Sequence, residues 1–106
     1  MMRNLLLGFA GIVAAAQGAA AQDANHGRQL FMLDGCYECH GMVGQGSPAG
    51  PRLAPVAITA AAIIRYIRNP PGVMPPYSPL VISDSDIADI HAYLATIKKP
   101  TVKIPE

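Results

Sequence analysis

Two cysteines and one histidine stand together in the segment Cys36-Tyr37-Glu38-Cys39-His40, and the chain of 106 residues contains no other cysteine. This C-x-x-C-H spacing is the attachment signature of a covalently bound haem. Two intervening residues let one turn of chain bring both thiols to the two vinyl groups of one porphyrin. His40 is then held beneath the ring, where an imidazole nitrogen can bind the iron. The segment therefore predicts one haem c, attached through Cys36 and Cys39 and ligated by His40.

Closely spaced cysteines also occur in two other kinds of site. A zinc site usually needs a second Cys or His pair, and the sequence has none with suitable spacing. A thioredoxin-like dithiol is expected within a βαβ unit, whereas this chain shows no convincing strand pattern. An exported dithiol or zinc module is thus an open alternative, and covalent haem is the favoured interpretation.

The second axial ligand of the iron is predicted to be a methionine, because electron-transferring haems commonly pair His with Met. The five candidates are Met1, Met2, Met32, Met42 and Met74. Met74 lies well beyond His40 in the segment 72–77, whose prolines keep the chain stiff. Met74 is therefore the predicted ligand, and packing in a core gap is the alternative interpretation. His26 and His91 are the other candidate ligands.

The spacing of apolar residues predicts short helices. The first covers residues 23–33, where Gly27, Leu30 and Phe31 share a face, and Gly35 ends it. The glycine- and proline-rich run 41–55 is expected to be loop.

Two further helices follow the loop. One covers residues 60–68 with Thr59 as its N-cap, and prolines after Asn69 stop it. Its apolar face comprises Ala60, Ile63, Ile64 and Ile67. The last helix is capped by Ser83, with Asp86 in its first turn, and is expected to continue through Lys98 and Lys99 to Pro100. Its predicted buried stripe comprises Ile87, Ile90, Leu94 and Ile97.

The predicted fold class is therefore all-α, with three or more short helices and long loops wrapped around one covalent haem. Eight of the ten prolines lie between Pro48 and Pro79, so the middle of the chain is irregular. Loops of this length are unusual in a small domain and make sense where they enclose a ligand. A cofactor would also add the core volume that a short chain lacks.

The first 21 residues are typical of a secretory signal. Arg3 supplies a positive start, residues 5–16 are mostly apolar, and the alanines at 19–21 suit a signal peptidase. We expect a signal peptide at 1–21 and a monohaem domain at 22–106, located in the periplasm, with no membrane span in the mature chain. An uncleaved anchor is the alternative.

The charge of the chain gives little guidance about its partners. Without Arg3, Lys plus Arg and Asp plus Glu each number seven. Nucleic-acid binding usually requires a clustered basic face, which the sequence does not show, so nucleic acid is not an expected partner.

Taken together, these motifs resemble the class I cytochromes c in their small bacterial, monohaem form. The resemblance covers nearly all of residues 22–106. The resemblance implies that Gly27 and Phe31 on the first helix pack against Tyr93 and Leu94 on the last. The other matching features are the Cys36–His40 motif, the segment 50–53, and Met74 with Pro75. It implies that the carbonyl oxygen of Pro51 accepts a hydrogen bond from the axial imidazole.

The chain departs from the family in lacking the tryptophan that many relatives place near a haem propionate. By this resemblance Arg52, Tyr66 or Tyr77 is expected to take that place, and ordinary packing or solvation is the alternative.

The predicted function is periplasmic electron transfer, with iron cycling between the ferric and ferrous states. The expected partners are a periplasmic dehydrogenase and a terminal oxidase or another cytochrome. One alternative is a haem-c subunit of a dehydrogenase complex. Another is an open-site, peroxidase-like haem enzyme, which would require that Met74 is not a ligand.

Overall fold

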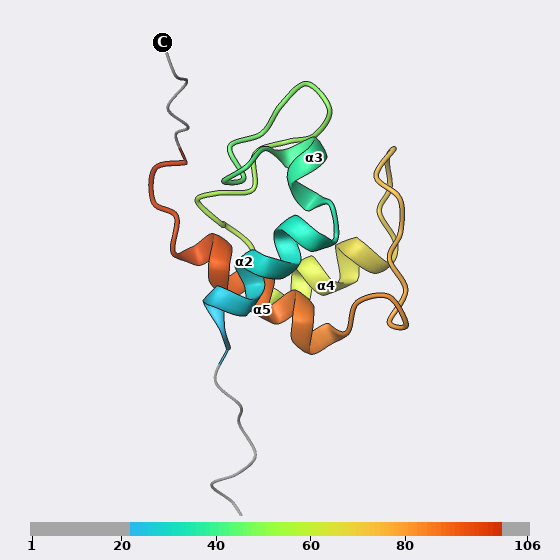
Figure 1. The fold of residues 1–106 in the computed structure, drawn as a ribbon. Coiled ribbons are helices and arrows are strands. Elements are labelled where there is room, and N and C mark those ends of the chain that lie inside the picture. The colour runs from blue at the N-terminus through green and yellow to red at the C-terminus, as the bar shows by residue number, and fades with distance from the viewer. Residues whose placement is uncertain (1–21, 101–106) are drawn as a thin grey trace, which may run out of the picture.

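The computed structural model describes residues 22–100, and the expected signal peptide lies outside them. Figure 1 shows four helices: α2 (Ala24–Leu33), α3 (Cys36–His40), α4 (Ala60–Arg68) and α5 (Asp84–Ala95). Among the described residues there is no strand, only an isolated bridge between Ser47 and Gly50. The predicted all-α class is confirmed.

Helices α2 and α5 cross at a very short distance. A Cβ atom built on Gly27 would lie 1.9 Å from the carbonyl oxygen of Asp89, so only glycine allows this approach. One turn further along α2, the rings of Phe31 and Tyr93 pack with their centroids 5.6 Å apart and an interplanar angle of 59°. This tilted geometry is favourable for an aromatic pair. The contact expected between the first and last helices is thus confirmed.

The hydrophobic core lies between α2, α4 and α5. Its largest fully buried side chains are Phe31, Ile87 and Leu94. Burying one such side chain contributes roughly 1.5–3 kcal/mol. Ile63 and Ile67 extend the core from α4, which packs on α5. These helices form the frame from which the loops and α3 project.

Side-chain caps fix where three of the helices begin. The side chains of Asp23, Thr59 and Ser83 accept hydrogen bonds from the backbone N–H of the third residue of α2, α4 and α5 respectively. Such a cap is worth about 1 kcal/mol. The caps predicted at Thr59 and Ser83 are confirmed, and so are the bounds of α4.

The last helix ends earlier than its sequence predicts. It stops at Ala95, so Lys98 and Lys99 lie outside it and Ile97 is only partly buried. The hydroxyl of Thr96 donates to the carbonyl oxygen of Tyr93 at 2.6 Å, and the N–H of Thr96 donates to the same oxygen. These bonds close a tight turn and take the place of the next helical bond.

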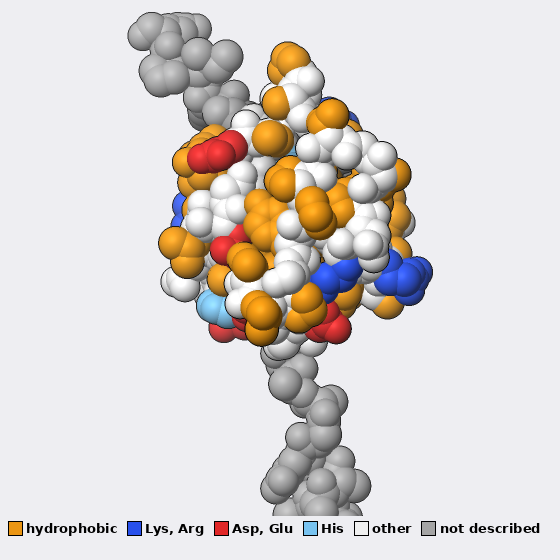
Figure 2. Space-filling model, turned by 90° about the vertical axis from the view of Figure 1, so that its right-hand side faces the viewer, with side chains coloured by type: hydrophobic (Ala, Val, Ile, Leu, Met, Phe, Trp, Pro, Cys, Tyr) orange, Lys and Arg blue, Asp and Glu red, His pale blue; other side chains and the backbone are white. Residues whose placement is uncertain are grey.

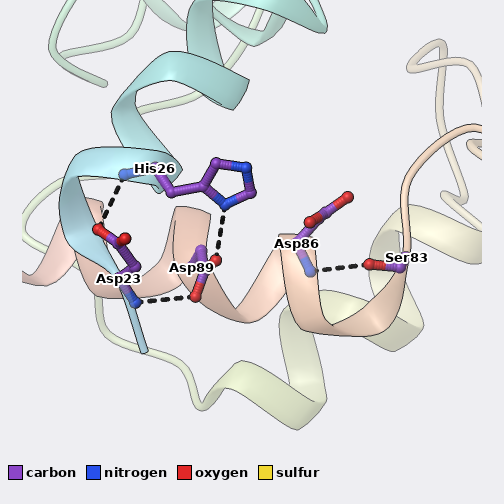
Figure 3. Close-up of polar contacts among 5 residues, drawn as sticks. All are labelled: Asp23, His26, Ser83, Asp86 and Asp89. Atoms are coloured by element: carbon purple, nitrogen blue, oxygen red, sulfur yellow. Dashed lines mark hydrogen bonds and ion pairs between the residues drawn. The ribbon is translucent and has the colours of Figure 1, made fainter. Parts of the chain in front are cut away.

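A polar cluster holds the start of α2 against α5 (Figure 3). Nδ1 of His26 lies 2.8 Å from Oδ2 of Asp89, and the N–H of Asp23 donates to Oδ1 of the same carboxylate. Asp89 is largely buried, so both of its oxygens need these partners. The cluster fixes the register of the two helices beside Gly27.

None of the helices in the described region has the length and apolar character needed to cross a membrane.

Candidate haem-binding site

The C-x-x-C-H motif forms a five-residue helix of its own. Gly35, with φ of 80°, takes the left-handed conformation between α2 and α3, and Gly41, with φ of 87°, ends α3. Within α3, Cys36 is half-buried and Cys39 is exposed. One helical turn therefore places both thiols and His40 on a short, separately oriented element. The spacing of apolar residues does not predict a helix here.

The environment of Cys36 favours a neutral sulfur. Burial, together with the nearby carboxylate of Asp34, raises the pKa of the Cys36 thiol to about 11. The thiolate is the nucleophile in disulfide exchange and the form that binds metals. A thioether carries no charge and is therefore well suited to this position. The site fits thioether attachment better than dithiol or zinc chemistry.

The imidazole of His40 is oriented by the backbone of the following loop. Its Nδ1 lies 2.8 Å from the carbonyl oxygen of Pro51, the contact implied by the family resemblance. A carbonyl oxygen can only accept, so Nδ1 carries the hydrogen. Nε2 then keeps its lone pair and is available to an iron atom.

The loop 41–55 folds back over the C-terminal end of α3. The hydroxyl of Ser47 donates to the carbonyl oxygen of Cys39 at 2.6 Å, and the N–H of Gly46 donates to that of His40 at 2.7 Å. A Cβ atom on Gly50 would lie 2.9 Å from the Cys39 oxygen and 3.1 Å from the His40 ring. The loop thus satisfies the free carbonyls of α3 and forms a close cradle for the imidazole.

The glycine and proline content of this loop predicts only irregular chain, and it does not single out Gly46 and Ser47 as supports of the motif. The clustering of glycines directly after His40 was the available signal, because a close approach of two backbones requires residues without a side chain.

The predicted distal ligand lies on the long segment between α4 and α5. Met74 is partly buried and packs against the core, whereas its neighbour Val73 is 96% exposed. Prolines flank Met74 on its C-terminal side. The segment therefore holds the thioether inward, and ligation of iron by Met74 stays a prediction.

The two histidines considered as alternative ligands make other contacts. His26 is bonded to Asp89 through Nδ1, and Nε2 of His91 lies 2.8 Å from the carbonyl oxygen of Ile58. Both side chains tie helices to other segments. These contacts favour Met74 over either histidine as the distal ligand.

The residues expected near a propionate lie in different settings. Arg52 is exposed directly after Pro51, and Tyr66 is 46% exposed on α4. Tyr77 is partly buried, and its hydroxyl donates to the carbonyl oxygen of Asp34 at 2.8 Å. Its single phenolic proton therefore serves this contact. A propionate contact for Arg52, Tyr66 or Tyr77 stays a prediction.

One face of the molecule exposes several hydrophobic side chains. Figure 2 looks onto the side where the segment between α4 and α5 lies, and hydrophobic side chains gather there. On this segment Leu80 is 97% exposed and Val81 is 65% exposed. A porphyrin ring is large, flat and mostly apolar. Its contact with such a surface would remove apolar area of both from water, which is favourable.

These observations together fit a covalent haem. Cys36 and Cys39 would form the thioethers, and His40 would bind the iron through Nε2. The haem would supply a one-electron couple between ferric and ferrous iron. The residues of the chain supply its attachment, the orientation of the imidazole and an apolar surface.

Comparison with known proteins supports the same assignment. The family described as cytochrome C oxidase, cbb3-type, subunit III has a model that matches residues 22–94. No curated protein and no solved structure matches the chain. The family match spans more than half of the sequence and contains the motif, the Pro51 loop and Met74; the chain belongs to this family, and its domain is a class I c-type cytochrome.

Proposed function

We propose that this protein is a periplasmic carrier of single electrons, with His40 and Met74 as the axial ligands of its haem. As a member of its family the chain carries haem c bound covalently, and the family function is electron transfer. In addition to this family function, we propose the His40 and Met74 ligand pair, the periplasmic location and the role of a free carrier. A thioether ligand favours ferrous iron and raises the reduction potential.

The observation that carries the proposal is the contact between His40 and Pro51. This bond holds the imidazole in one tautomer and one orientation, with the nitrogen that would bind iron left free. A ligand fixed in this way changes little between the two oxidation states. Small rearrangement suits an electron carrier, which must gain and lose one electron without altering its surroundings.

The location is supported by the sequence. Residues 1–21 have the pattern of a secretory signal. Encounter with redox partners would take place through a small, transient contact, which is typical of electron-transfer proteins. A periplasmic dehydrogenase as donor and a terminal oxidase or another cytochrome as acceptor would fit this location.

Two measurements test the core of the proposal. A haem stain on a denaturing gel should be positive, because thioether bonds survive unfolding. The ferric protein should show the far-red absorption band of a sulfur-to-iron bond. Met74→Ala should abolish that band and lower the reduction potential, whereas the control Met42→Ala, at a half-exposed residue, should retain both properties.

Other outcomes would contradict the proposal. A chain without haem after denaturation would contradict covalent attachment. An unchanged band in Met74→Ala would exclude Met74 as the ligand. Rapid binding of carbon monoxide and peroxide by the unmutated protein would instead favour an open-site haem enzyme.

A second candidate is a subunit of a larger oxidoreductase. The matching family is described as subunit III of a cbb3-type oxidase, so domains of this kind occur within a complex. A haem-c subunit of a periplasmic dehydrogenase is a related form of this candidate. Purification from the native host under mild conditions distinguishes the candidates, because a subunit should copurify with a cofactor-bearing partner and a free carrier should purify alone.

A further inference from the structure

Tyr77 joins the methionine segment, the chain between α4 and α5 that carries Met74, to two other parts of the molecule: the turn before the haem motif and the end of α4. Its hydroxyl donates to the carbonyl oxygen of Asp34, in the turn that leads from α2 to the haem motif. Its backbone N–H donates to the carbonyl oxygen of Ile67 at 3.1 Å, and its own carbonyl accepts from Arg68 at 3.0 Å. Arg68 is also paired with Asp84 at the start of α5.

Tyr77 is also the first residue after residue 69 that hydrogen bonds hold in place. Within residues 22–100, the stretch 70–76 makes no hydrogen bond of its own. Only Pro75 and Pro76 lie between Met74 and Tyr77, so three chain steps limit their separation to about 10 Å. The position of the Met74 sulfur relative to α3 therefore depends on where Tyr77 is held.

The phenol of Tyr77 is suited to remain a donor. Its burial raises the pKa of the hydroxyl above the ordinary value, so the proton that bonds to Asp34 stays in place at neutral and mildly alkaline pH. Among residues 22–100, this is the only hydrogen bond that a side chain of the stretch 70–79 makes with another segment. It connects the two sides between which a haem would lie.

We propose that Tyr77 is a positioning residue, which holds the Met74 segment to the turn before the haem motif and thereby stabilises the bond between Met74 and iron. The inference rests on the proposed ligation by Met74. Loss of the hydroxyl leaves the haem attached and the methionine able to bind. It increases the fraction of time in which the methionine is detached.

Tyr77→Phe tests this role in the haem-bearing protein, with cyanide as the probe. Cyanide binds ferric iron only where the methionine has left, so its affinity reports the detached fraction. Loss of one hydrogen bond should raise the affinity about threefold to tenfold. The far-red band should persist in the absence of cyanide. Ser78→Ala, which removes a hydroxyl that bonds only within its own segment at the neighbouring exposed residue, should leave the affinity unchanged.

A double-mutant cycle separates positioning from a general structural role. In a Met74→Ala background there is no methionine to detach, so Tyr77→Phe should change the cyanide affinity less than twofold. Arg68→Gln removes the guanidinium group that donates to the carbonyl oxygen of Tyr77, and it should also raise the cyanide affinity when Met74 is present.

Two results would overturn the inference. One is a cyanide affinity equal to that of the unmutated protein in both Tyr77→Phe and Arg68→Gln. The other is an increase in Tyr77→Phe that is equally large without Met74. Failure of the proposed function looks different, because the far-red band would then survive Met74→Ala.

Discussion

Nδ1 of His26 lies 2.8 Å from Oδ2 of Asp89, so the first turn of α2 is bonded to the middle of α5. The hydrogen bond to Asp89 raises the pKa of His26. The pKa of Asp89 is lowered, first by the N–H of Asp23 and then by His26. The two shifts have opposite signs and define a window of pH in which the pair stabilises the fold.

The first prediction concerns that window. The contribution of His26 is complete below its unfolded pKa of 6.5 and is lost as the pH rises through the raised folded value. The contribution of Asp89 is present above its unfolded pKa of 3.8 and is lost as the pH falls through the lowered folded value. His26→Asn should therefore be most destabilising between these limits and less so in alkaline solution.

Denaturant unfolding of His26→Asn and of the unmutated protein over a series of pH values measures the difference in their free energies of unfolding. Asp89→Asn provides the control background, because it removes the carboxylate charge and the shifts that depend on it. In that background His26→Asn should show no corresponding pH dependence. A difference between His26→Asn and the unmutated protein that stays constant with pH would contradict the prediction.

The second prediction concerns the helix crossing at Gly27. Its added Cβ would meet Asp89 backbone atoms, which cannot move aside as a side chain could. Gly27→Ala should lower the free energy of unfolding by about 1–3 kcal/mol, despite the better helix propensity of alanine. Gly72→Ala is the matched control, since nothing lies within 4 Å of its added Cβ. Equal denaturation midpoints for the two variants would contradict this account.

The third prediction concerns the cradle around His40. Gly50→Ala would bring a methyl group to 3.1 Å from the imidazole and so disturb the bond between Nδ1 and Pro51. A weaker bond makes the imidazole a poorer electron donor to iron. The reduction potential should rise by roughly 20–60 mV, the equivalent of one ordinary hydrogen bond. Redox titration of the purified protein measures this shift, and a potential that falls would refute the mechanism.

The fourth prediction concerns the start of α5. The hydroxyl of Ser83 accepts the N–H of Asp86 at 3.0 Å (Figure 3). Ser83→Ala should cost about 1 kcal/mol of stability. Ser85→Ala, two residues later at an exposed position, should change stability by less than about 0.5 kcal/mol. Thermal unfolding of the two variants side by side provides the measurement, and indistinguishable midpoints would argue against the cap.

Local patterns in the sequence were sufficient to predict the helices that form the core. Thr59 and Ser83 could be recognised as caps because a hydroxyl directly before an apolar periodic run has few other structural uses. Gly27 and Phe31 could be paired with the last helix through the family resemblance. The family itself could be recognised from the motif, since its spacing is fixed by the geometry of one porphyrin.

Contacts between segments far apart in the chain could not be predicted from the sequence. Neither the bond from Tyr77 to Asp34 nor the pair of His26 and Asp89 leaves a periodic trace, because each depends on how segments far apart in the sequence pack together. The end of α5 was placed too late for a different, local reason. The apolar spacing continues to Ile97, but the hydroxyl of Thr96 bonds back to the chain and closes the turn.

The separation between the helical core and the haem motif has a consequence for how such a protein can change. The stability of the fold comes mainly from the packing of α2, α4 and α5. The motif helix α3 contacts α2 alone among these helices. Substitutions at exposed positions of the loop 41–55 and of the methionine segment can therefore alter the electron affinity of the iron while the core, which includes Ala54 of the loop, stays as it is. One frame can in this way serve donors and acceptors of different potential, and adaptation to a new partner requires few changes.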